Sequence, residues 1–191
     1  MSGMMHGSRS RGFSMIEVLV ALLVIAIGVL GAVALQTRAV QAGMETYQRT
    51  QALLLVEDMV ARMRNNKANI STCYAAVGSG TPGYVGTGVR SAPSGCNSLA
   101  DQDLEQWHAA LLGAAELTDD STTAAQVGGI LNARGCISSG AASGEYRISV
   151  AWQGLSRLGS VQGKDSCGQG AYESESYRRV VGVTLRVSDL R

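Results

Sequence analysis

Residues 12–35 read GFSMIEVLVALLVIAIGVLGAVAL, and this stretch decides the fold. From Val18 to Leu35 there is no charged or polar side chain, and a run of this length is enough for a helix that spans a membrane. Arg9 and Arg11 precede it, and an excess of positive charge marks the cytoplasmic side of a membrane segment. The sequence therefore predicts a single-pass membrane helix with a cytoplasmic N-terminus.

Glu17 stands at the start of the apolar run, where a charge costs free energy and usually has a function. One alternative is a secretory signal peptide, because residues 31–34 loosely offer a small-x-small cleavage site, but such a signal needs no acid there. Cleavage between Gly12 and Phe13 accounts for the acid. The new α-amino group would lie four residues before Glu17 on the same helical face, and the acid would meet the positive end of the helix dipole.

A basic leader, a glycine, an aromatic residue, an acid and an apolar run, in this order, resemble the class III leader and N-terminal helix of type IV pilins and secretion pseudopilins. In that family a prepilin peptidase cuts after the glycine and methylates the new N-terminal phenylalanine. The glutamate at the fifth mature position helps to dock the subunit into the filament. The resemblance assigns cleavage to Gly12 and Phe13, N-methylation to Phe13 and assembly to Glu17.

The periplasmic half of the helix narrows the resemblance to minor pilins of the PilV, or type IV pilus modification protein, group. The segments that carry it are LQTRAVQA at 35–42, YQR at 47–49, ALL at 52–54 and DMVARMRNN at 58–66. The resemblance implies a minor pilin that helps to prime assembly of the type IV pilus and enters the filament at or near its tip. It would thereby support twitching motility and adhesion.

The partners that the resemblance implies are the prepilin peptidase, other minor pilins, the major pilin and the inner-membrane assembly machinery. Membrane lipid surrounds the apolar helix before assembly. The subunit is expected first in the inner membrane, with its head in the periplasm, and then in the pilus on the cell surface. The formal net charge of +1 gives no reason to expect a nucleic-acid partner.

The helical pattern continues beyond the membrane, since no proline occurs from Gln36 to Arg64. Apolar residues recur at helical spacing at Ala52, Val56, Met59 and Met63. Asp58 and Arg62 are spaced as a surface ion pair on another face. We expect one helix from Phe13 to a stop at about Asn65.

This interpretation divides the chain into four segments. Residues 1–12 form the cleaved leader, and residues 13–35 form the half of the helix that lies in the membrane and later in the filament core. Residues 36–66 form the periplasmic half of the helix, and residues 67–191 form the globular head.

The four cysteines, Cys73, Cys96, Cys136 and Cys167, all follow the apolar run. None forms a CxxC pair, so their spacing argues against a zinc site or a thioredoxin-type motif. An even number of widely spaced cysteines predicts two disulfides in an oxidising compartment; four free thiols in a cytosolic protein are the alternative. Of three possible connectivities we predict the sequential one, Cys73–Cys96 with Cys136–Cys167.

The first part of the head alternates loops with one helix. Residues 78–95 contain both prolines and many glycines, which predicts a long loop. Asp101 to about Leu117 reads as an amphipathic helix, and residues 119–125 as a polar loop. The apolar stripe of that helix consists of Leu104, Trp107, Leu111 and Ala115.

The second part of the head carries strand signals. Bulky residues alternate from Tyr146 to Trp152 and again from Val181 to Val187, and Arg134 to Ser138 is a weaker strand. A three- to four-stranded antiparallel sheet packed on the outer half of the long helix is the natural core. The predicted fold class is therefore α+β, the architecture of type IV pilins.

No catalytic constellation is recognisable in the sequence, so neither an enzyme activity, nor a cofactor, nor a metal is expected. His6 belongs to the leader, and His108 is expected on the polar flank of its helix as a solvated side chain. Arg178 and Arg179 are expected to solvate an edge strand. Two rival functions stay open: a subunit of the type II secretion pseudopilus, and a single-pass membrane enzyme or receptor that keeps residues 1–12.

Overall fold

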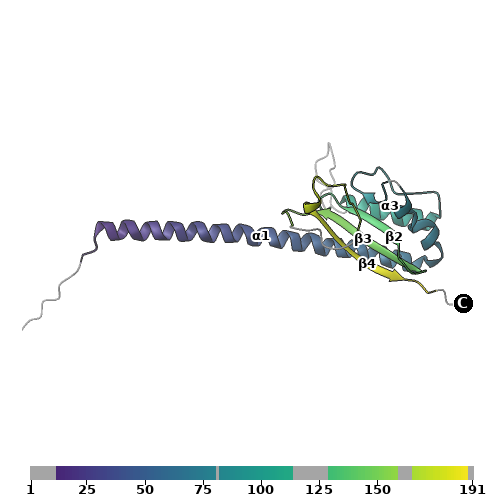
Figure 1. Cartoon of the computed structure of the whole chain (residues 1–191), viewed down its shortest axis with the longest axis horizontal. Helices are drawn as coiled ribbons and strands as arrows, with labels where there is room; N and C mark the ends of the chain where they lie inside the picture. The colour runs from purple at the N-terminus through teal and green to yellow at the C-terminus, as the bar shows by residue number, and fades with distance from the viewer. Residues whose placement is uncertain (1–11, 81, 114–128, 159–164, 189–191) are drawn as a thin grey trace, which may run out of the picture. The chain divides into compact units, whose positions relative to one another are not determined.

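The computed structural model describes residues 12–80, 82–113, 129–158 and 165–188. The leader before Gly12, the polar loop at 119–125 and the end of the predicted helix at Ala115 to Leu117 lie outside the described residues. The chain divides into two units, residues 1–43 and 44–191. The helix α1 (Met15–Asn65) supplies residues to both units (Figure 1).

In the first unit, the described residues of α1 are exposed, and those from Val18 to Leu35 are apolar. An 18-residue window of the helix has a mean hydropathy of 3.1, which is long and apolar enough to cross a membrane. None of that window is buried within the chain. The predicted apolar helix is therefore present, and no side chain in this window is buried by the residues that the structure describes.

In the second unit, α1 forms one wall of the core. Its buried residues are Ala52, Val56, Met59, Val60 and Met63. This set contains the whole stripe that was predicted from helical spacing, and α1 ends at Asn65, as expected. Three short helical turns follow it: the 3₁₀ turn Lys67–Asn69, the π turn Ile70–Tyr74 and α2 (Ala76–Ser79). They bury Ile70, Tyr74 and Val77 against the same core.

Helix α3 (Ser98–Leu112) begins at a side-chain cap, because the Asn97 side chain accepts hydrogen bonds from the backbone N–H groups of Leu99 and Ala100. The predicted stripe of Leu104, Trp107 and Leu111 is buried. The predicted end near Leu117 is wrong. Gly113 adopts a left-handed conformation with φ of 87° and closes the helix at Leu112, as a C-terminal glycine commonly does.

The sheet is fully antiparallel in the order β1-β2-β3-β4. Its strands are β1 (Val85–Gly86), β2 (Arg134–Ser139), β3 (Glu145–Gln153) and β4 (Arg178–Arg186). The two strands predicted from alternation are confirmed as β3 and β4, and the weaker strand predicted at Arg134 to Ser138 is confirmed as β2. The prediction that residues 78–95 form only a loop is wrong in one place, because Val85 and Gly86 pair with β2 as β1.

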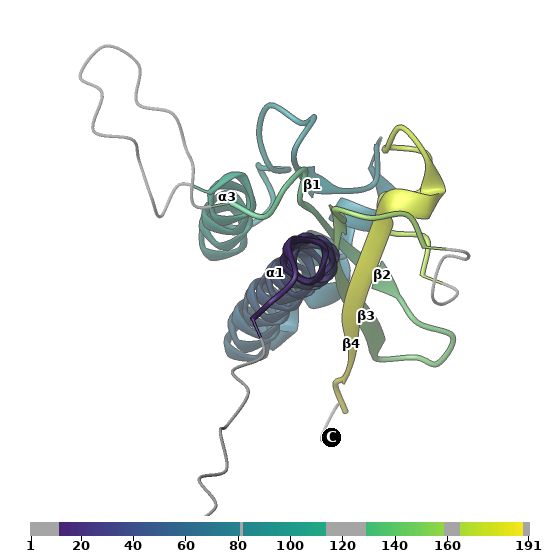
Figure 2. The same ribbon diagram turned by 90° about the vertical axis from the view of Figure 1, so that its left-hand side faces the viewer.

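The core of the second unit lies where α1, α3 and the sheet meet (Figure 2). Trp107 of α3 is completely buried and donates its indole N–H to the backbone carbonyl of Leu55 in α1, at 2.9 Å. Its ring lies against Gly135 of β2, where a Cβ atom would overlap the ring and come within 2.7 Å of Leu111 Cδ1. A long apolar helix packed on a small antiparallel sheet confirms the expected α+β architecture.

Candidate functional site

The first candidate site is the junction between the leader and α1. The helix begins at Met15, so Phe13 precedes it in the uncleaved chain. The carbonyl of Ser14 accepts the backbone N–H groups of Glu17 at 3.0 Å and Val18 at 3.4 Å. Phe13 and Glu17 thus do not yet share a helical face, although Glu17 lies in the first turn, where the helix dipole favours an acid.

Gly12 occupies open space. A Cβ atom built on it meets nothing within 4 Å, and its φ lies outside the left-handed region that favours glycine. Neither the packing nor the backbone of the described residues therefore requires a glycine here.

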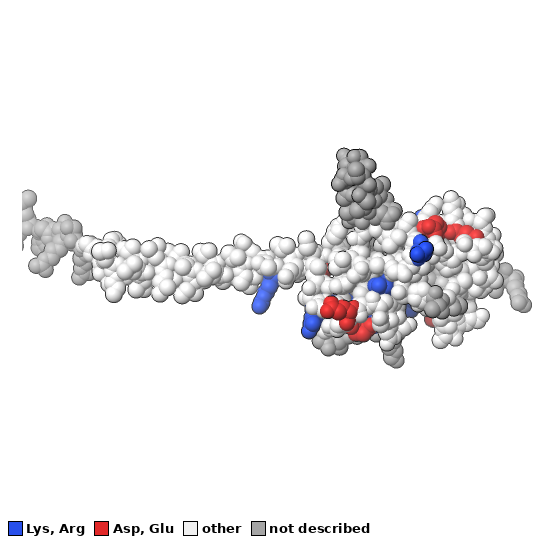
Figure 3. Space-filling model, turned by 90° about the horizontal axis from the view of Figure 1, so that it is seen from above, with Lys and Arg blue, Asp and Glu red and all other residues white. Residues whose placement is uncertain are grey.

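Glu17 is exposed and makes no ion pair with any residue that the structure describes. The apolar side chains that follow it are exposed as well, among them Val18 and Leu19. On the face drawn in Figure 3, most charged side chains lie on the head, one basic side chain lies on α1 outside it, and the apolar half of α1 is uncoloured. An acid in such surroundings is costly in lipid unless a partner compensates its charge.

Both predicted disulfides are present in the head, with the sequential pairing. Cys73–Cys96 joins the π turn to the segment before α3, with 5.6 Å between the Cα atoms. Cys136–Cys167 joins β2 to the segment that leads into β4, with 5.7 Å between the Cα atoms. Each bridge ties a segment without regular ladder partners to the core.

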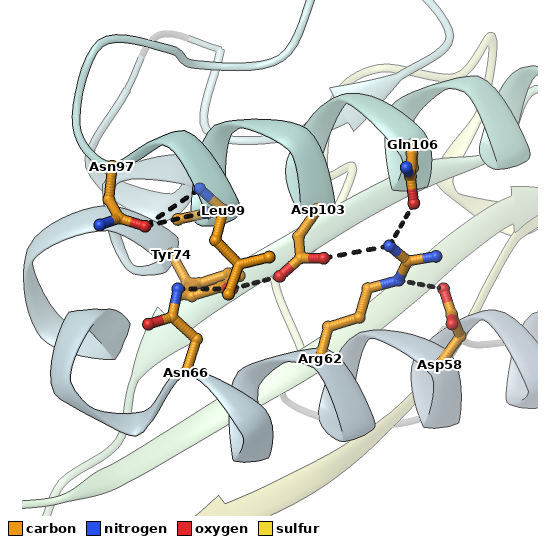
Figure 4. Close-up of polar contacts among 9 residues, drawn as sticks. Asp58, Arg62, Asn66, Tyr74, Asn97, Leu99, Asp103 and Gln106 are labelled. Atoms are coloured by element: carbon orange, nitrogen blue, oxygen red, sulfur yellow. Dashed lines mark hydrogen bonds and ion pairs between the residues drawn. The ribbon is translucent and has the colours of Figure 1, made fainter.

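A group of polar contacts holds α1 to α3 (Figure 4). Arg62 bonds Asp58 at 2.9 Å, as its spacing predicted, but it also bonds Asp103 at 3.1 Å and Gln106 at 2.6 Å on α3. The Tyr74 hydroxyl donates to the second carboxylate oxygen of Asp103. This group is a bridge between two helices rather than the single surface pair that the sequence indicated.

Tyr74 is buried at this bridge, and its hydroxyl also accepts a hydrogen bond from the Asn66 side chain at 3.2 Å. Burial, followed by the hydrogen bond to Asp103, raises the pKa of Tyr74 to about 12. Asp103 and Tyr74 were missed in the sequence, because neither belongs to the apolar stripe and no local spacing links them.

The expectation that Arg178 and Arg179 solvate an edge strand is wrong. Arg178 is 5% exposed, pairs with Glu175 at 2.6 Å and donates to the carbonyls of Asp165 and Cys167. Arg179 pairs with Glu45 of α1 at 3.2 Å. Both side chains bind elements of the head together.

Glu45 receives a second set of contacts from Ser156, whose hydroxyl donates to it at 2.8 Å. Burial raises the pKa of the Glu45 carboxyl, but the hydrogen bonds from Ser156 and the charge of Arg179 outweigh burial and hold the pKa below its usual value. Residues 154–158 and the start of β4 are thereby attached to α1.

The expectation that His108 is solvated is also wrong. It is 3% exposed, and its Nδ1 accepts the backbone N–H of Gly86 at 3.0 Å. Nδ1 is the acceptor in this hydrogen bond, and the bond holds β1 against α3. This contact was not predicted, because β1 was not recognised in the sequence.

Arg134 of β2 is a buried cation that sequence reasoning did not single out. Its guanidinium lies over the rings of Tyr84, at 5.3 Å, and Tyr172, at 4.5 Å. One of its ring-facing groups, Nε, has no hydrogen-bond partner among the described residues. Tyr84 precedes β2 in the chain and Tyr172 follows it, so Arg134 contacts two segments that are distant in sequence.

The arrangement as a whole holds segments together and presents one unpaired acid on an apolar helix. Within the described ranges, no group of three or more His, Cys, Asp or Glu side chains is placed to hold a metal ion.

Two family comparisons cover the first part of the chain. Residues 7–33 match the prokaryotic N-terminal methylation motif. Residues 34–86 match the family of the type IV pilin Tt1218. No curated protein and no solved structure matches the chain.

The second match runs from within α1 to the end of β1, and the first covers the leader junction and the apolar helix. Together with the architecture, they identify the fold as a type IV pilin-like α+β fold and support a pilin role. A prepilin leader implies processing by a prepilin peptidase and assembly with other pilins. Type IV pilins are structural proteins, and the apolar helix fits membrane anchoring before assembly.

Proposed function

We propose that this chain is a PilV-like minor pilin of the type IV pilus, which helps to prime filament assembly and enters at or near the tip. Residues 1–12 are the leader, residues 13–35 the membrane and filament-core segment, residues 36–66 the outer half of the helix and residues 67–191 the head. The subunit crosses the inner membrane once, with its head in the periplasm. It supports twitching motility and adhesion through the pilus.

Processing follows from the leader junction. A prepilin peptidase hydrolyses the bond between Gly12 and Phe13, and the new amino group of Phe13 is methylated. The open space around Gly12 supports this role, because the chain itself has no use for a glycine there. Among the described residues, no atom lies within 4 Å of a Cβ atom built on Gly12, which is compatible with close approach of a peptidase.

The observation that carries the proposal is the contrast between Glu17, which is exposed and has no ion pair among the described residues, and Asp103 and Arg178 of the head, which are buried and paired. The methylated amine of Phe13 on a neighbouring subunit supplies the missing cation. Such a pair is worth more in a filament core of low dielectric than in water. Glu17 therefore favours entry into a filament over retention in lipid.

The deciding experiment replaces Glu17 in a strain whose only copy of the gene carries the change. We expect Glu17→Ala to be inserted and cleaved normally but to be lost from sheared pili, and Glu17→Gln to fail largely, because it keeps the shape and loses the charge. Glu57→Ala is the matched control, since Glu57 is an exposed acid on the outer half of the same helix. Normal piliation with Glu17→Ala would overturn the role of Glu17.

The rivals separate in the same preparations. Mass spectrometry of the mature N-terminus in pili and in membranes should find N-methylated Phe13. A membrane enzyme or receptor would keep residues 1–12 and stay in the membrane. A secretion pseudopilin would be processed but would affect secretion rather than sheared-pilus yield.

A further inference from the structure

The two edges of the sheet differ in length. One edge is β1, which has two residues, whereas the other is β4, which has nine. Folded proteins normally shorten or cover the edges of a sheet, because a long free edge offers backbone groups to another chain. Figure 1 shows β4 at the border of the sheet, with β3 on one side only. Among the described residues, β4 therefore has a long outer edge with no strand paired to it.

The register identifies which backbone groups of β4 point away from β3. Hydrogen bonds from Val187 N–H to Gly144 and from Gly154 N–H to Tyr177 mark the bonded pairs, so the odd-numbered residues of β4 bond β3. The backbone N–H and C=O groups that face outward belong to Val180, Gly182, Thr184 and Arg186. None of them has a backbone partner among the described residues.

The second half of this edge is also accessible from its side chains. Thr184 and Arg186 are exposed, and Val183 is 37% exposed although it shares its strand face with the buried Leu185. An incoming strand would cover Val183 and extend the apolar layer beyond β4.

A basic hollow lies at the end of the edge. Its volume is about 260 Å³, and its lining consists of Arg64, Lys67, Leu185, Arg186, Val187 and Ser188. Arg64 and Lys67 are exposed and pair with no acid that the structure describes. Arg186 pairs with Glu145 at 3.2 Å, but its side chain is still 81% exposed. The hollow thus favours an acidic partner.

A second copy of β4 is not the acidic partner that the hollow favours. The strand reads RRVVGVTLR, with three arginines and no acid. Antiparallel pairing with itself would bring Arg186 of one copy towards Arg178 and Arg179 of the other, and like charges on adjacent strands destabilise their pairing. The charges favour a different chain.

From the open edge and the basic hollow together, we infer that β4 is a docking strand for an extended, acidic segment of another pilin subunit. The segment adds a strand along Val180 to Arg186 and places a carboxylate in the hollow beside Arg64 and Lys67. This inference rests on the proposed function for the identity of the partner as a pilin. The surface itself rests only on the head.

The test is photo-cross-linking in piliated cells, with p-benzoylphenylalanine in place of Thr184 in the full chain. We expect a cross-linked peptide, sequenced by mass spectrometry, from an acidic extended segment of another pilin. The same probe in place of Leu99, which is exposed on α3, is the control position. A yield no higher than that control, or a cross-link to a second copy of the chain, would overturn the inference.

Two variants sharpen the result. Arg64→Glu with Lys67→Glu should lower the yield at Thr184 about tenfold. Arg49→Glu with Arg90→Glu changes net charge equally at exposed sites elsewhere and should leave the yield unchanged. Thr184→Pro removes one outward N–H and spares the ladder to β3, so it should abolish cross-linking from a probe at Val183 while the head stays folded.

The failures of the two proposals are distinguishable. If the chain enters sheared pili but gives no cross-link at Thr184, the docking strand is wrong and the pilin function stands. If the chain keeps its leader and never enters pili, while Thr184 still cross-links to an acidic strand that is not from a pilin, the proposed function and the pilin partner are both overturned.

Discussion

The two halves of α1 have the same secondary structure and opposite surroundings. Up to Met44 every described residue of the helix is exposed, whereas from Ala52 to Met63 one face is buried against the head. Burial of apolar surface contributes about 25 cal/mol per Å² to stability, so the second half is stabilised within the chain. The apolar window of the first half is not buried by any residue that the structure describes. The comparison teaches that one helix can form a wall of the core in one half and leave an apolar surface exposed in the other.

The largest expected effect is on cleavage, and it should arise at the leader junction but not elsewhere in the apolar helix. Gly12→Leu should abolish cleavage, because the peptidase must bring the backbone at this position close to its own groups. Gly28→Leu is the matched control, since Gly28 also stands in open space, and it should mature normally. The fraction of mature chain on a gel decides it. Normal maturation of Gly12→Leu would contradict the class III leader assignment.

The next effect should be confined to the head. Replacing Cys136 and Cys167 with serine opens a loop with a sequence separation of 31 and should lower the free energy of unfolding by about 3–4 kcal/mol. Both tryptophans, Trp107 and Trp152, lie in the head, so denaturant unfolding followed by their fluorescence reports on this unit. Insertion of the anchor into membranes should not change. An unaltered unfolding midpoint would show that the bridge does not stabilise the head.

The third prediction concerns the polar contacts that join α1 to α3. Asp103→Ala removes the acceptor of the Tyr74 hydroxyl and the carboxylate of α3 that pairs with Arg62, and it should cost about 2–3 kcal/mol of head stability. Asp58→Ala removes a carboxylate that is 43% exposed and should cost at most about 0.5 kcal/mol. The same fluorescence assay compares them. Equal losses for the two variants would mean that the contact to α3 adds nothing to the ion pair within α1.

The smallest effect is a dependence on pH. Because the pKa of Tyr74 is raised from 10 to about 12, its protonated form stabilises the head below pH 10. That contribution is lost as the pH rises from about 10 towards about 12, and it amounts to at most about 2 kcal/mol. Unfolding free energies measured between pH 8 and pH 11 should therefore fall more steeply for the native head than for Tyr74→Phe. Parallel curves would contradict the shift.

Much of the fold could be predicted, because it depends on local periodicity. The alternation from Tyr146 to Trp152 gave β3, and the spacing of Val56, Met59 and Met63 gave the buried face of α1. Asn65 was recognisable as a stop. These signals are contained within single elements, so no tertiary contact was needed to recognise them.

The misses share a different cause. His108, Arg178 and Arg179 were expected in solvent, but each is held by a segment distant in sequence, and no local pattern reveals such a contact. The C-terminal end of α3 was missed because the left-handed backbone of Gly113 outweighed the apolar pattern that continues beyond it. At the leader junction the residue types could be recognised, but the described residues offer Glu17 no ion-pair partner that would explain its place in the sequence.

The contact between Trp107 and Gly135 links the largest and the smallest residue of the chain across two elements, since the indole ring occupies the place of a side chain on β2. Substitutions at these two positions are therefore coupled. Related chains that carry a larger residue at 135 should carry a smaller one at 107, so that the summed volume is kept. In a combinatorial library at both positions, most folded clones should keep the summed side-chain volume of the two residues nearly constant.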